Sequence, residues 1–94
     1  MAQQQRYLTC GVDQTIPLEL QLFMWECVER MPEPRDYLQV FDLKPAGILQ
    51  SITHRSEEPA YKMEYVIPME NPVAAKVYII DDNTHSTMLL AEEY

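Results

Sequence analysis

The stretch PLELQLFMWECVERM, residues 17–31, decides the fold class, because it is the one segment with the pattern of a helix. It contains no internal Pro or Gly, and the fixed φ of Pro17 suits the first turn of a helix. At 100° per residue, Glu19, Glu26 and Arg30 fall in one narrow stripe, and apolar side chains occupy most of the remaining circumference. We therefore predict a helix over 17–31 that is largely buried, with an i,i+4 ion pair between Glu26 and Arg30.

The segments around this helix have the pattern of strands. Residues 6–12, RYLTCGV, alternate with period two, and the chain after the helix is rich in aromatic and β-branched residues. Short loops containing Pro, Asn or Asp separate five further strand-like segments, namely 36–43, 48–55, 61–67, 74–80 and 87–93. We predict an α+β fold, with one largely buried helix packed on a mostly antiparallel, curved sheet of about six strands, in the order β-α-β-β-β-β-β.

Length and composition indicate one folded domain. The chain has 94 residues, of which 47% are hydrophobic, and this is enough for one modest core. We expect residues 6–94 to form a single α+β domain and the polar residues 1–5 to be a disordered N-terminus.

The charge balance excludes several classes of function. Fifteen acidic residues against seven basic ones give a net charge of −8, which repels nucleic acids and anionic membrane surfaces. No apolar run approaches the ~20 residues that span a bilayer, and no signal peptide is visible. We expect a cytoplasmic protein whose two cysteines are thiols.

Five stretches together resemble a known family: RYLTCGV, IPLELQLFMWE, DYLQVFDL, ITHRSEEPAYKMEY and HSTMLLAEEY. They are similar to small proteins of low-GC Gram-positive bacteria, in the family called domain of unknown function 960. The resemblance extends from Arg6 to Tyr94 and implies a small bacterial cytosolic protein. The family carries no assigned activity, cofactor or catalytic residue, so the resemblance implies no site.

The best candidate for chemistry is YIIDDNTHST, residues 78–87, which places Asp81, Asp82 and His85 within five positions. Carboxylates and an imidazole are ligands for Mn²⁺, Mg²⁺, Zn²⁺ or Fe²⁺. Asp and Asn also favour tight turns, and an Asp-Asp-Asn-Thr run between apolar segments is typical of a hairpin connection. We interpret the segment as a turn and expect no metal or cofactor. A metal-assisted enzyme using these three residues is the alternative.

The two cysteines offer little for catalysis. Cys10 shares a face of the predicted first strand with Leu8 and Val12, and Cys27 lies within the apolar arc of the helix. We predict that both are buried and behave as small hydrophobic residues.

His54 and Trp25 also have structural interpretations. His54 lies where a strand meets an acidic loop, and we predict a partly exposed imidazole paired with Glu57 or Glu58. Trp25 is predicted to be in the core, because the helix that carries it is buried broadly.

An excess of apolar residues in the last two strands favours an interaction function. Both faces of these strands are apolar, whereas one helix covers only one face of a sheet. The second face either curls inward or binds a partner, which would be an unidentified protein or a second copy of the chain. We therefore predict a non-catalytic protein-interaction domain; a variant of this idea is an acidic decoy for a nucleic-acid channel. The predicted partner-binding residues are Tyr78, Ile80, Met88, Leu90, Glu92 and Glu93.

Overall fold

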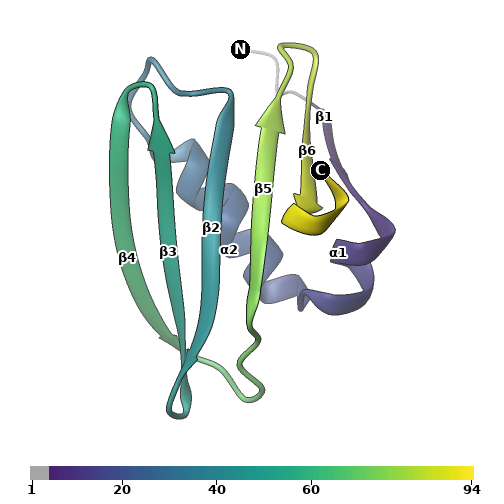
Figure 1. The fold of residues 1–94 in the computed structure, drawn as a ribbon, viewed down its shortest axis with the longest axis vertical. Helices are drawn as coiled ribbons and strands as arrows, with labels where there is room; N and C mark the ends of the chain where they lie inside the picture. The colour runs from purple at the N-terminus through teal and green to yellow at the C-terminus, as the bar shows by residue number, and fades with distance from the viewer. Residues whose placement is uncertain (1–4) are drawn as a thin grey trace.

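The computed structural model describes residues 5–94, and within this range six strands form one sheet in the order β1-β6-β5-β2-β3-β4 (Figure 1). The strands are β1 (Gln5–Leu8), β2 (Leu38–Ala46), β3 (Leu49–Glu57), β4 (Ala60–Pro68), β5 (Ala75–Asp81) and β6 (His85–Leu90). Helices α1 (Cys10–Thr15) and α2 (Leu18–Glu29) precede β2, and the 3₁₀ turn η1 (Ala91–Glu93) follows β6. Four pairings are antiparallel and that of β1 with β6 is parallel. The predicted α+β class with a mostly antiparallel sheet is confirmed.

Helix α1 is the main departure from the predicted order of elements. Residues 6–12 were expected to be one strand, but β1 ends at Leu8 and α1 begins at Cys10. Thr9 joins them: its N–H donates to the Met88 carbonyl at 3.1 Å, and its Oγ1 accepts the N–H of Val12 at 3.2 Å. A threonine that accepts a backbone N–H in this way is a favoured N-cap. The cap therefore overrides the apolar alternation, and the order becomes β-α-α-β-β-β-β-β.

Helix α2 spans most of the predicted range 17–31. It lies behind the sheet in Figure 1. Its predicted ion pair is present, with Arg30 Nη2 at 3.0 Å from Glu26 Oε2. A smaller part of the circumference of α2 is buried than predicted, since Leu18 and Leu22 are 66% and 57% exposed. The reason is that α2 packs against the sheet with one side only. The buried residues of α2 are Leu20, Gln21, Met24, Trp25 and Cys27.

The core lies between the helices and one face of the sheet. Alternate side chains of the central strands point toward the helices, as the period of two requires. The core residues are Val12, Ile16, Leu20, Met24, Trp25, Cys27, Phe41, Leu43, Ile52, Met69, Val77, Ile79 and Met88. The predicted place of Trp25 in the core is confirmed.

The two ends of the chain differ from the predicted ranges. Of the expected disordered residues 1–5, residues 1–4 lie outside the described part of the chain, and Gln5 is already the first residue of β1. The last strand was expected over 87–93, but β6 ends at Leu90 and η1 follows. The sheet is open, with β1 and β4 at its edges. Over residues 5–94, no helix is long and apolar enough to cross a bilayer.

Candidate functional site

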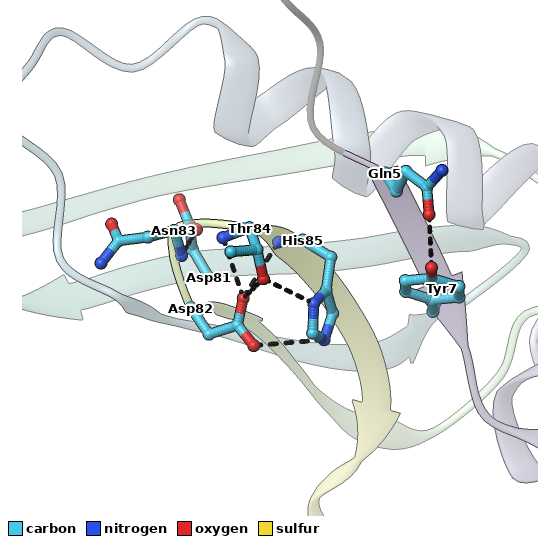
Figure 2. Close-up of polar contacts among 7 residues, drawn as sticks. All are labelled: Gln5, Tyr7, Asp81, Asp82, Asn83, Thr84 and His85. Atoms are coloured by element: carbon cyan, nitrogen blue, oxygen red, sulfur yellow. Dashed lines mark hydrogen bonds and ion pairs between the residues drawn. The ribbon is translucent and has the colours of Figure 1, made fainter.

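Residues 81–85 form the connection between β5 and β6 (Figure 2). Asp82 Oδ1 accepts the backbone N–H groups of Thr84 at 3.1 Å and His85 at 2.9 Å. Asp81 Oδ1 accepts the N–H of Asn83 at 2.8 Å, and Asn83 itself has φ +80°. Each of these features is a reason why Asp and Asn are common in turns. The predicted hairpin turn is confirmed.

The contacts within the turn separate Asp81 from the other two candidate metal ligands, Asp82 and His85. Asp82 Oδ2 lies 3.2 Å from His85 Nε2, while the Asp81 carboxylate is bonded to the loop backbone (Figure 2). The backbone N–H of His85 and the two donors of Thr84 hold the pKa of Asp82 below its usual range. Across residues 5–94, no three His, Cys, Asp or Glu side chains are arranged to hold a metal ion. The side chains of Asp81, Asp82 and His85 form hydrogen bonds and an ion pair within the turn.

The left-handed backbone at Asn83 gives a test of this turn. We expect Asn83→Val to lower the free energy of unfolding by roughly 1–2 kcal/mol, because a β-branched residue at positive φ is strained. Asn83→Gly is the matched control and should be nearly neutral or slightly stabilising. Urea denaturation of both variants measures the difference. Equal midpoints for valine and glycine would contradict the turn geometry.

The two cysteines differ from each other. Cys10 is exposed, because it begins α1 and does not lie on a strand face, so its predicted burial is wrong. Cys27 is buried as predicted, and burial raises the pKa of its thiol despite a hydrogen bond with Tyr65. A raised pKa leaves less of the reactive thiolate at neutral pH. Cys27 is therefore a core residue.

The prediction for His54 is wrong. Its imidazole was expected to be partly exposed and paired with Glu57 or Glu58, but it is 0% exposed. Its position in β3 turns it toward the helices, where it stacks on Phe41 with ring centroids 4.3 Å apart. Tyr61 of β4 contacts it edge-on at 5.0 Å. The ring is thus held between aromatic neighbours.

The hydrogen bonds around His54 define its tautomer. Gln39 Nε2 donates to the carbonyl of Asp36 at 2.9 Å, so the Gln39 Oε1 faces His54. Because Oε1 only accepts, His54 Nε2 must carry the proton of the 2.7 Å bond between them. Nδ1 is then a bare acceptor with no partner among the described residues. Burial lowers the pKa of His54 to about 4.

The register of β5 with β6 splits the predicted partner-binding strip. Tyr78 and Ile80 point away from the helices, and the β6 residue opposite Tyr78 is Leu89. Met88 and Leu90 point to the helix side, where Met88 is 0% exposed. The four apolar residues Tyr78, Ile80, Met88 and Leu90 therefore do not form one surface. A shift of one residue in pairing exchanges the two faces of a strand.

Glu93, predicted to lie at the margin of that strip, has an internal role. Its Oε1 accepts the Thr9 hydroxyl at 2.6 Å and the Leu90 N–H at 2.8 Å, and these bonds hold its pKa below the usual range. A Cβ at Gly11 would stand 2.5 Å from Glu93 Oε2, so glycine makes room for the carboxylate. Glu93 thus ties the C-terminal turn to α1. Glu92 is exposed, and its partner-binding role stays a prediction.

The face of the sheet opposite the helices, which we call the open face, has an apolar centre. Val40 and Leu89 are 8% and 9% exposed, and the side chains around them are half-buried. The open face is defined by Leu38, Val40, Tyr78, Ile80 and Leu89. The ring of Tyr94 packs edge-on against Tyr78 at 5.4 Å. Neither α1 nor α2 covers this face, whereas η1 contacts β5 and Tyr94 packs on the open face (Figure 1).

A cleft of 580 Å³ adjoins the open face beside the β3–β4 turn. It is lined by Arg35, Asp36, Tyr37, Leu38, Val40, Arg55, Ser56, Glu57, Glu58, Lys76 and Tyr78. Asp36 builds one wall, because its carboxylate accepts the N–H groups of Leu38, Glu57 and Glu58. Sequence reasoning missed this cleft, since its residues come from three distant segments. The Pro-rich run before Asp36 was the one local signal, and it indicates only a loop.

Charge is distributed unevenly over the molecule. Five of the seven basic residues lie on the open side of the sheet or line the cleft: Arg35, Lys44, Arg55, Lys62 and Lys76. Five acidic residues accompany them: Asp36, Asp42, Glu57, Glu58 and Glu64. The other ten acidic and two basic residues account for the whole net charge of −8. We call these ten residues together the open side, and their formal charges sum to zero.

A family model described as a staphylococcal protein of unknown function, DUF960, matches residues 5–93. The chain belongs to this family. The resemblance inferred from the sequence is thereby confirmed. The DUF960 chain is also similar to a crystal structure of a protein of unknown function from Enterococcus faecalis, with a TM-score of 0.85 and 23% identity. That similarity covers 97% of this chain and 91% of the other, and it shows a shared fold.

No curated protein matches this DUF960 chain. The family description and the Enterococcus faecalis structure both specify unknown function. Function must therefore be argued from the open face and the cleft.

Proposed function

We propose that this chain is a non-catalytic protein-interaction domain that binds another protein on its open face. The observation that supports this is an apolar sheet centre that neither α1 nor α2 covers. Most of a sheet's apolar side chains are normally covered by a second layer. The half-buried Leu38, Tyr78 and Ile80 would lose their remaining exposure to water beneath a partner.

The cleft supports the same proposal through its residue types. Tyr37, Tyr78 and two arginines, Arg35 and Arg55, line the cleft. Tyrosine and arginine are enriched among residues that dominate binding energies. Arg55 Nε is held 3.2 Å from Asp42 Oδ2, which fixes its orientation before a partner arrives. A side chain that is already ordered loses less entropy on binding.

The formal neutrality of the open side indicates what kind of partner it accepts. The net negative charge lies on the rest of the molecule, so it would not set the affinity by direct contact. We infer a protein partner that presents an apolar centre with mixed charges around it, as interfaces commonly do. The binding constant should then change little between low and moderate salt, whereas an acidic decoy would bind much more weakly in salt.

We also propose that the protein acts in the cytoplasm. Both cysteines are free, and that compartment keeps thiols reduced.

The experiment is affinity capture from a lysate of the source cells, followed by calorimetry with each purified candidate. The test variant carries Tyr37→Ala and Tyr78→Ala on the open side. The matched control carries Leu18→Ala and Leu22→Ala on the exposed side of α2. We expect a protein that binds the wild type and the control equally, with affinity for the test variant reduced about tenfold or more.

Hydrogen exchange of the complex locates the contact. Protection of β2 and β5 would agree with binding on the open face. If the tyrosine variant binds every candidate as tightly as the wild type does, the proposed surface is wrong.

A further inference from the structure

Strand β4 is a long strand with a free edge. It has nine residues, and within residues 5–94 it pairs with β3 alone. Its outer edge therefore presents a row of backbone N–H and C=O groups that another strand can pair with. Both side-chain faces are also accessible in places, since Met63 is 45% and Val66 58% exposed.

The sequence of β4 is nearly symmetric about Met63. Tyr61 and Tyr65 flank it at two residues, and Lys62 and Glu64, of opposite charge, flank it at one. We propose that β4 pairs antiparallel with β4 of a second copy of this chain, about a two-fold axis at Met63. In this register Lys62 faces Glu64 of the partner subunit, and the symmetry makes that contact twice. Opposite charges directly across two strands stabilise the pair.

The hydrogen-bonding pattern of β4 is compatible with a two-fold axis at Met63. The Asp81 N–H donates to the Tyr37 carbonyl, so alternation along β2 directs the backbone groups of Val40 toward β3. The registers carry this alternation across β3, so Met63 and its neighbours at two residues direct their backbone groups toward β3. Ala60, Lys62 and Glu64 direct theirs outward. A two-fold axis at Met63 thus makes Lys62 and Glu64 of the partner subunit a hydrogen-bonded pair.

The side chains need little rearrangement. Lys62 Nζ lies 3.5 Å from Glu64 Oε2 of the same strand, and the two side chains are 64% and 67% exposed. Pairing of two copies would exchange this contact for one between subunits. The resulting sheet would continue through both copies, with both open faces on the same side. The dimer does not depend on the proposed function, because β4 and the cleft tyrosines are separate surfaces.

Another interpretation of Lys62 predicts the opposite behaviour. A lysine on an edge strand commonly prevents pairing with other chains, and Pro68 at the end of β4 could serve the same purpose. If Lys62 is such a guard, the wild type is a monomer and replacing the lysine increases association. If Lys62 is an interface residue, replacing it weakens the dimer.

Charge reversal separates the two interpretations in sedimentation experiments. We expect the wild type to dimerise with a dissociation constant of about 10–100 μM, as a small interface allows. Lys62→Glu, and separately Glu64→Lys, should each raise that constant about tenfold or more by placing like charges opposite each other. The double variant Lys62→Glu with Glu64→Lys restores the opposite charges and should restore the dimer.

Disulfide trapping tests the register. In a Cys10→Ser background, which removes the exposed thiol, Met63→Cys should form a covalent dimer under mild oxidation, because the Cα atoms of directly opposed residues that are not hydrogen-bonded lie about 4.5 Å apart. Lys62→Cys is the control and should cross-link much less, since its own copy lies diagonally across the pair. The Tyr37→Ala and Tyr78→Ala variant should dimerise like the wild type. A monomeric wild type at 1 mM, or equal trapping at positions 62 and 63, would overturn the proposal.

Discussion

Replacing Trp25 with alanine is expected to lower the free energy of unfolding by about 3–5 kcal/mol, as truncation of a buried aromatic residue does. Trp25 is 7% exposed and belongs to the core between α2 and the sheet. The Arg6 guanidinium lies over its ring, 5.0 Å from the centroid, and Arg6 also forms an ion pair with Glu29. The indole thus supports the edge strand β1 as well as the core. Such a loss is a large part of a small domain's stability.

Denaturant unfolding followed by circular dichroism measures this effect. Leu18→Ala is the matched control on the same helix, and it should change stability by less than about 0.5 kcal/mol because Leu18 is 66% exposed. Trp25→Phe should fall between the two, since phenylalanine fills part of the space. If Trp25→Ala and Leu18→Ala have the same midpoint, α2 does not pack as described.

Sequence alone was sufficient for the features that depend on local rules. The helix over 17–31 follows from a long segment without Pro or Gly, and the turn at Asp82 and Asn83 follows from residue types that fold their own loop. Both predictions concern residues close together in the chain. The extent of helix burial was overestimated, because an apolar residue such as Leu22 can remain exposed when a helix has only one neighbour.

Most of the errors come from interactions between residues that are distant in the chain. Thr9 caps helix α1 where a strand was predicted, and its hydroxyl donates to Glu93 from the other end of the chain. The register of β6 placed Met88 in the core and Leu89 on the open face. Local alternation defines two faces of a strand but does not say which face meets the helices.

The cleft lies beyond sequence reasoning for the same reason. Tyr37, Arg55 and Lys76 meet because β2 lies between β3 and β5. That strand order is set by the packing of the whole sheet. The sequence did predict an apolar second face, and this part of the interaction hypothesis now has a defined surface to test.

Acid is expected to destabilise this protein through His54, in a range above the titration of ordinary carboxyl groups. The imidazole is buried as the neutral tautomer that donates from Nε2 to Gln39. Protonation would add a proton at Nδ1, which has no acceptor among the described residues. Burial accordingly lowers the pKa of His54 to about 4, from 6.5 in the unfolded chain.

The sign of the effect follows from which state binds the proton. Above pH 6.5 His54 is neutral in both states and does not make stability depend on pH. As the pH falls from 6.5 toward 4, His54 binds a proton in the unfolded chain but not in the folded protein, so the free energy of unfolding decreases. Below pH 4 both states are protonated and the loss levels off. The total loss is on the order of 3 kcal/mol.

Unfolding by urea at a series of pH values from 7 to 4.5 measures this loss, and the pH range limits interference from Asp36, Asp82 and Glu93. The lowered pKa values of these carboxyl groups stabilise the folded protein, and this stabilisation is lost chiefly when the pH falls below the usual carboxyl range. His54→Gln and His54→Phe should both flatten the dependence, whatever their stability at pH 7. Leu18→Ala changes an exposed side chain that does not titrate, and it should leave the slope unchanged. In NMR the His54 ring should titrate near pH 4, and a midpoint near 6.5 would show that the imidazole reaches water, which the packing between Phe41 and Tyr61 does not allow.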